Sequence, residues 1–186
     1  MENKAPKKPQ GWLMLFLVSL VAALTLAGTN EMTKDAIAQR ALEEAEAARR
    51  AVLHIAETFE SMQLPEGSVV DNGYRGLKEG QTIGYVAQST VRGYAGDIEV
   101  IVGMDLDGKL TGISVGGTKF SETVGLGDKA KSPAFTEQFI GLALPVKLQE
   151  DVDAISGATI TSTAVVLGVN QAGEYLTGVL SSGESK

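Results

Sequence analysis

The chain has 186 residues, a formal net charge of −7, 22 glycines, one histidine and no cysteine. This length allows one compact domain with an appendage. Without cysteine the chain forms no disulfide and no Cys-ligated iron–sulfur cluster. The single histidine, His54, cannot build a His-based metal site, so we expect it to be a helix-surface or packing residue. The acidic balance argues against nucleic-acid binding, no Gly-x-Ser-x-Gly nucleophile motif occurs, and we assign no catalytic residue and no metal ligand.

The N-terminus combines a basic tail with an apolar run. Residues 1–10 carry three lysines and one glutamate, and residues 12–28 are apolar apart from one serine and one threonine. The run is near the lower limit for a membrane span. A signal peptide is the alternative, but the long core and the helical pattern after it favour a retained single-pass anchor over residues 11–29. The positive-inside rule then places residues 1–10 in the cytoplasm and the main domain outside the cell membrane.

Residues 30–64 read as a helical stalk. A stripe of small side chains, mostly alanine, runs between charged residues, and Glu46 and Arg50 have the i, i+4 spacing of a helical ion pair. Pro65 and Gly67 end this pattern.

The pattern then changes to strands. We expect strands over residues 82–91, 98–104 and 110–115, since apolar side chains alternate at Ile98, Val100, Val102 and Met104. The segment 105–108 (Asp-Leu-Asp-Gly) resembles a calcium loop only at its start, so a hairpin turn is the better interpretation. These features predict an α+β domain over residues 65–180, with an antiparallel sheet and flanking helices.

A long polar loop, residues 116–131, follows the last of these strands, and its length and glycines favour a functional role. Residues 133–142 are expected to form a short helix with Phe135, Phe139 and Ile140 inward, and residues 144–148 a strand. The final helix carries an apolar face at spacings of three and four: Val165, Val169, Ala172, Leu176 and Val179. Residues 181–186 are expected to be a frayed tail.

A run of small residues precedes this final helix. Gly157 and Ala158 allow close approach to the backbone, and Thr159 offers a hydroxyl beside a helix start, where unpaired N–H groups suit a phosphate. An ordinary Ser/Thr cap is the alternative explanation.

The segment 153–159, Asp-Ala-Ile-Ser-Gly-Ala-Thr, resembles the flavinylation motif of FMN-binding redox subunits. In that family the last threonine carries FMN through a phosphoester, and Thr159 occupies that position. The segment 122–127, Glu-Thr-Val-Gly-Leu-Gly, is similar to the Glu-Thr-Pro-Gly-Leu-Gly loop of the same domain. With the anchor and the segment that follows it, the chain resembles the G subunits of the Rnf electron-transport complex. The related C subunits of the sodium-pumping NADH:quinone reductase share the flavin motif but are usually longer.

This resemblance implies a set of cofactor-binding residues around FMN bound to Thr159. Asp153 supports the attachment motif, and Ser156, Gly157 and Ala158 lie beside the attachment point. In the loop, the resemblance implies close approach to the ring at Gly125 and Gly127, apolar contact from Val124 and Leu126, and polar contact or loop fixing by Glu122 and Thr123.

The resemblance also implies a function and partners. A separate flavin transferase would attach the FMN, and the subunit would relay electrons in a membrane complex that couples ferredoxin and NAD oxidoreduction to Na⁺ or H⁺ translocation, together with the other Rnf subunits. The alternatives are a C-type subunit of the quinone reductase, a membrane-anchored flavin-binding sensor, and a structural subunit with a degenerate site.

Two positions depart from the family pattern. Phe120 stands where the family often has histidine, and Val124 stands where it often has proline. A contact made by that histidine is therefore not available in this chain.

Overall fold

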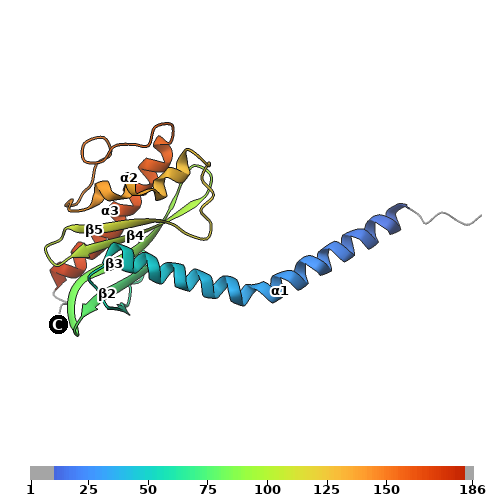
Figure 1. Ribbon diagram of the computed structural model, residues 1–186, viewed down its shortest axis with the longest axis horizontal. Helices are drawn as coiled ribbons and strands as arrows, with labels where there is room; N and C mark the ends of the chain where they lie inside the picture. Colours follow the sequence, from blue (N-terminus) through green and yellow to red (C-terminus); the bar gives the residue numbers. More distant parts are fainter. Residues whose placement is uncertain (1–10, 183–186) are drawn as a thin grey trace, which may run out of the picture. The chain divides into compact units, whose positions relative to one another are not determined.

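The computed structural model describes residues 11–182, so the expected basic tail 1–10 and the last residues of the expected tail 181–186 lie outside the described residues. The elements run in the order α1 (Gly11–Val52), β1 (Thr58–Ser61), β2 (Asn72–Lys78), β3 (Gln81–Arg92), β4 (Asp97–Asp105), β5 (Leu110–Gly116), the 3-10 helix η1 (Gly127–Lys131), α2 (Pro133–Thr136), the 3-10 helix η2 (Glu137–Phe139) and α3 (Thr159–Ser182). The expected α+β class is confirmed (Figure 1). The described residues divide into two compact units between Glu43 and Glu44, each treated by itself below.

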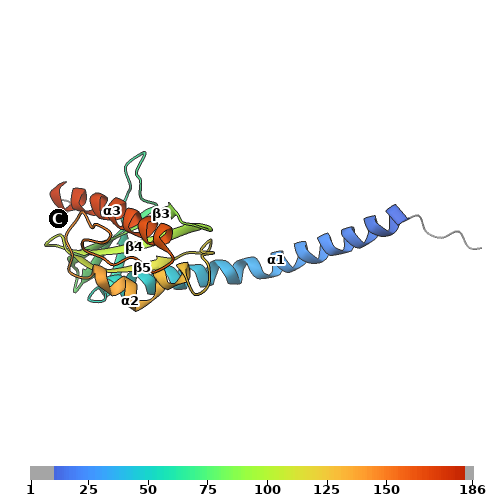
Figure 2. The same cartoon turned by 90° about the horizontal axis from the view of Figure 1, so that it is seen from above.

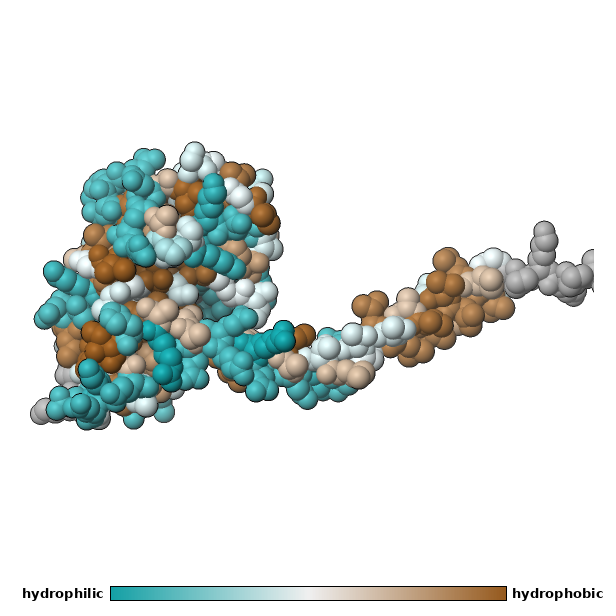
Figure 3. All heavy atoms as spheres, in the orientation of Figure 1, coloured by the Kyte–Doolittle hydropathy of each residue, from teal (hydrophilic) through white to brown (hydrophobic). Residues whose placement is uncertain are grey.

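The first unit contains most of α1. Among the described residues, α1 is the one helix that is long and apolar enough to cross a membrane, with a mean hydropathy of 2.1 over its most apolar 18 residues. Large apolar side chains there are exposed at nearly every position from Trp12 to Leu26. Figure 3 shows brown surface gathered toward the N-terminal end of the helix on the face in view. A helix that is apolar all round needs an apolar environment, so this segment has the composition of the expected anchor.

The second unit is built on a five-stranded antiparallel sheet in the order β1-β2-β3-β4-β5. Each strand pairs with the next along the chain, and short turns join β2 to β3, β3 to β4 and β4 to β5, while a longer loop joins β1 to β2. The turn between β4 and β5 is held by Asp105, whose Oδ1 accepts hydrogen bonds from the backbone N–H groups of Asp107 (3.0 Å) and Lys109 (2.8 Å). Gly108 supplies the positive φ of 79°. The expected hairpin turn is therefore confirmed.

Helix α3 covers one face of the sheet (Figure 2). The five apolar positions predicted to share one helix face are all buried against the strands. Gly168 allows a close approach, because a Cβ there would lie 2.9 Å from the Val100 side chain. The Ser89 hydroxyl donates to the Gly168 carbonyl at 2.9 Å, which fixes the helix against β3.

The opposite face of the sheet receives the end of α1. Glycines on four strands leave room there: added Cβ atoms at Gly76 and Gly84 would meet the Leu53 side chain, and those at Gly103 and Gly112 would meet the Val52 backbone. The Thr111 hydroxyl also donates to the Val52 carbonyl at 2.5 Å. The end of α1 is therefore seated in a glycine-floored groove, below called the glycine groove.

This groove corrects the expected stalk. The stretch 30–64 is helical only to Val52, and residues 58–61 join the sheet as β1. The chain leaves the helix because Leu53 and Ala56 turn onto the sheet and become buried. His54, expected on or near a helix surface, lies just after the helix and is exposed. The ion pair between Arg50 and Glu46 is confirmed at 2.9 Å.

The expected strand over residues 144–148 is wrong. Only an isolated bridge joins Leu148 to Val152. The amide of Asn170 on α3 bonds both the N–H and the carbonyl of Val146 at 2.8 Å. A side chain thus takes the place of a strand partner.

The short helix before this loop was only partly predicted. Phe135 and Phe139 are buried and meet edge-on at 5.5 Å. Ile140 is 56% exposed, contrary to expectation, because the backbone becomes extended at that residue.

Candidate functional site

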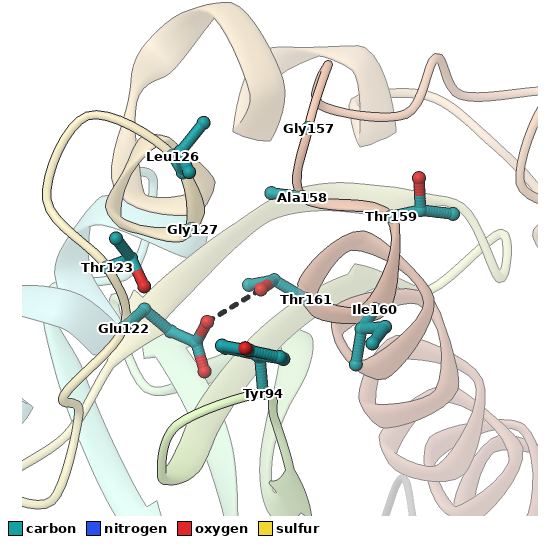
Figure 4. Close-up of a pocket in the computed structure, with 10 residues that line it drawn as sticks. All are labelled: Tyr94, Glu122, Thr123, Leu126, Gly127, Gly157, Ala158, Thr159, Ile160 and Thr161. Carbon is teal, nitrogen blue, oxygen red and sulfur yellow. Dashed lines mark hydrogen bonds between the residues drawn. The ribbon is translucent and has the colours of Figure 1, made fainter.

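A cavity of about 580 Å³ opens where three segments of the second unit meet: the β3–β4 turn, the loop after β5, and the start of α3. Figure 4 shows Glu122, Thr161 and Tyr94 from the three segments close together, with Thr159 on the far side of the first turn of α3. The lining residues are Tyr94, Glu122, Thr123, Leu126, Gly127, Gly157, Ala158, Thr159, Ile160 and Thr161.

Thr159 is the first residue of α3 and is exposed at the cavity. The preceding turn is tightly held: the Ser162 hydroxyl donates to the Ala158 carbonyl at 3.0 Å and accepts from the Ile155 N–H at 3.0 Å. Gly157 completes the turn with a φ of 78°. A helix N-terminus carries unpaired N–H groups and partial positive charge. The cavity therefore has a hydroxyl and an anion-favouring helix end side by side.

Glu122 joins all three segments. Only 6% of its surface is exposed. Its Oε2 accepts a 2.6 Å hydrogen bond from the Thr161 hydroxyl on α3, and its Oε1 accepts from the Ala95 N–H in the β3–β4 turn at 3.0 Å. One buried carboxylate thus ties the loop, the turn and the helix together.

The loop from Thr123 to Gly127 is a compact turn. The Thr123 carbonyl accepts from the N–H groups of Leu126 (3.1 Å) and Asp128 (3.2 Å). Gly125 has a φ of 81°. Val124 is 86% exposed and does not line the cavity. The turn therefore presents Leu126 and Gly127 to the cavity and Val124 to solvent.

Phe120, the residue in place of the family's histidine, lies under the Lys131 ammonium, which is 3.8 Å from its ring centre. A cation over an aromatic face is an attractive contact. Phe120 does not line the cavity, and its ring contacts Lys131 near the loop.

Most of the sequence-predicted site residues meet at this cavity. Its wall includes seven of them: Glu122, Thr123, Leu126, Gly127, Gly157, Ala158 and Thr159. Asp153, Ser156, Val124 and Gly125 do not line it. The contacts of all these residues with a cofactor stay predictions.

Three lining residues were missed: Tyr94, Ile160 and Thr161. Ile160 and Thr161 directly follow the attachment motif, so their position in the first turn of α3 was a usable signal. Tyr94 lies in a hairpin turn, and no local pattern links that turn to the cavity.

Comparison with known proteins places this geometry in a family. Residues 93–174 match the FMN-binding domain family. The chain is 35% identical over 183 residues to the G subunit of the Na⁺-translocating ferredoxin:NAD⁺ oxidoreductase complex of Acetobacterium woodii, covering 85% of this chain and 86% of the relative. It is 34% identical over 175 residues to the G subunit of the ion-translocating oxidoreductase complex of Methanosarcina acetivorans, covering 87% and 90%.

A solved structure supports the fold. The crystal structure of Shewanella oneidensis NqrC aligns with a TM-score of 0.52 at 19% identity, over 69% of this chain and 73% of that chain. Because the sequence relatives match across most of both lengths, the chain belongs to the G subunits of ion-translocating oxidoreductase complexes, with an FMN-binding domain over residues 93–174.

Proposed function

We propose that this chain is the electron-relay subunit of a membrane complex that couples ferredoxin:NAD⁺ oxidoreduction to Na⁺ or H⁺ translocation, and that it carries FMN as a phosphoester on Thr159. Family membership supports the complex and the cofactor. The observation that carries the attachment site is the position of Thr159, exposed at the N-terminus of α3 and on the wall of the cavity.

The cavity suits FMN in size and in chemistry. Its volume, about 580 Å³, lies within the range of small-molecule sites. The helix end beside Thr159 suits the phosphate. Leu126, Ile160 and Tyr94 give apolar surface for a ring, and a Cβ at Gly157 would lie 3.1 Å from Leu126. Glycine at that position therefore keeps space between the attachment turn and the loop.

Bound FMN supplies reversible uptake of one or two electrons, while the protein supplies position, exclusion of water and local charge. Thr159 holds the cofactor as an acceptor of the phosphoester and takes no part in turnover. The resemblance implies that a separate flavin transferase forms this bond during maturation. A covalent link prevents loss of the cofactor from a domain that lies outside the cytoplasm.

Membrane attachment follows from α1. Its apolar part is proposed as a single-pass anchor with residues 1–10 in the cytoplasm. The partners are then the other membrane and peripheral subunits of the same complex. Because one helix cannot enclose a polar path, the ion pathway belongs to those partners.

The test is peptide mass analysis of the protein made in its native host. We expect an FMN-minus-water adduct on the peptide that contains Thr159, and in-gel flavin fluorescence after denaturation. Thr159→Ala should lose the adduct and still fold, since the side chain is exposed. Thr159→Ser is the matched control, because it keeps a hydroxyl at the same place. Covalent flavin that persists in Thr159→Ala would contradict the attachment site.

A further inference from the structure

We propose that the Glu122 carboxylate lowers the midpoint reduction potential of the flavin held in this cavity. This inference rests on the proposed function, because it concerns the cofactor of that site. Glu122 would then have two roles: it ties the loop, the turn and the helix together, and it sets the reduction potential of the bound flavin.

Two glycines from different segments make room for this carboxylate. A Cβ at Gly93, directly after β3, would lie 2.5 Å from Glu122 Oε1. A Cβ at Gly127, the first residue of η1, would lie 2.5 Å from Oε2. The carboxylate therefore lies between two backbone segments that can approach it this closely only because each has glycine at the contact. This enclosure fixes its position.

The hydrogen bonds of Glu122 use it only as an acceptor. The Thr161 hydroxyl and the Ala95 N–H both donate to it, at 2.6 and 3.0 Å, which is the pattern of an ionised carboxylate. Among residues 11–182 no salt bridge to Glu122 is found. Within the described part of the chain, the Thr161 hydroxyl and the Ala95 N–H are thus the hydrogen-bond partners that offset this charge, and neither is itself charged.

A fixed negative charge beside a redox cofactor disfavours the form that has gained electrons. The interaction is strong at short range where water is excluded, and Glu122 is almost fully buried in the wall that lines the cavity. Charge and hydrogen bonds near the ring are the means by which a protein tunes a flavin. Removal of this charge should therefore make the flavin easier to reduce.

The first experiment compares the wild-type protein with Glu122→Gln by spectroelectrochemical titration of the flavin-loaded full chain in detergent, at one fixed pH. The amide has the same shape, can still accept from the Ala95 N–H, and can donate to the Thr161 oxygen. We expect a higher midpoint potential in Glu122→Gln. Incomplete loading does not affect the measurement, because only flavin-bearing molecules contribute to it.

Glu99→Gln is the matched control. Glu99 also packs against a glycine, Gly117, and also accepts a side-chain hydrogen bond, from Gln88 Nε2 at 3.0 Å. It does not line the cavity. We expect the midpoint potential of this variant to equal that of the wild type.

A second variant separates charge from general disturbance of the loop. Thr161→Val removes the hydroxyl that offsets part of the charge and leaves the carboxylate in place, so the potential should fall below the wild-type value. A disturbed loop alone gives no reason for Glu122→Gln and Thr161→Val to move in opposite directions. Thermal unfolding of each variant confirms that it is folded.

The proposal is overturned if folded Glu122→Gln has the wild-type potential or a lower one, if Thr161→Val has the wild-type potential or a higher one, or if folded Glu122→Gln carries no flavin. In the last case the carboxylate is needed for loading instead. Failure of the proposed function is distinct, because then the wild-type protein itself carries no covalent flavin on the Thr159 peptide.

Discussion

At the residue scale, Gly127 has less room for a side chain than Gly157, the other glycine that lines the cavity. A Cβ at Gly127 would lie 2.5 Å from Glu122 Oε2 and 2.9 Å from Thr161 Oγ1, so Gly127→Ala must push apart the hydrogen-bonded pair. Overpacking of this kind costs about 1–3 kcal/mol. We expect Gly127→Ala to lower the free energy of unfolding by that amount, measured by urea denaturation of the full chain in detergent.

Gly178→Ala is the control for this substitution. Gly178 lies within α3 with nothing within 4 Å of an added Cβ. Alanine there should be neutral or stabilise by about 0.5–1 kcal/mol, because it restricts the unfolded chain and favours the helix. If both variants changed the free energy of unfolding equally, lack of space beside Glu122 would not be the reason for glycine at position 127.

The sequence indicated some site residues and not others, for a physical reason. Thr159 and the 122–127 loop carry local motifs, and the structure brings both to one cavity. The bond from Thr161 to Glu122 joins residues 39 apart in the chain. No periodicity or spacing signals such a pair, since it exists only after α3 packs beside the loop. Tyr94 was missed for the same reason.

At the scale of secondary structure, the end of α1 is held in place by its packing in the glycine groove. Leu53 is 2% exposed and lies over Gly76 and Gly84. Leu53→Ala should lower the free energy of unfolding of the domain by about 2–5 kcal/mol, because it leaves a cavity between helix end and sheet. Thermal or urea unfolding of the full chain in detergent measures this loss.

Leu42→Ala is the matched control, because Leu42 lies within α1, the helix that ends directly before Leu53, and is 70% exposed. We expect it to change the unfolding of the domain by less than about 0.5 kcal/mol. A small effect of Leu53→Ala, similar to that of Leu42→Ala, would mean that the groove contact contributes little to the stability of the domain.

Elements with a clear periodic pattern were predictable, and elements set by tertiary contacts were not. The face of α3 and the β4–β5 hairpin follow from spacing and turn chemistry. The helix end at Val52 follows from four glycines on strands distant in sequence. The 144–148 segment has the apolar residues of a strand, yet the Asn170 amide satisfies its backbone at Val146.

For the whole molecule, the proposed orientation places the cavity outside the cytoplasm. Helix α1 continues from the apolar segment into the unit that holds the cavity. If residues 1–10 lie on the cytoplasmic side of the membrane, residues 44–182 therefore lie on the opposite side. Three lysines before the apolar run favour a cytoplasmic N-terminus. This orientation is testable because the chain has no cysteine, so a single introduced thiol reports one position only.

Glu66→Cys and Lys4→Cys provide the two reporters. Glu66 is exposed in the loop between β1 and β2, and Lys4 lies in the basic N-terminal segment. In right-side-out membrane vesicles from the native host, a membrane-impermeant maleimide should label Glu66→Cys at once and label Lys4→Cys only after detergent is added. Labelling in the reverse order would place the flavin domain in the cytoplasm. It would also remove the reason for a covalent cofactor bond, since free FMN is resupplied on that side of the membrane.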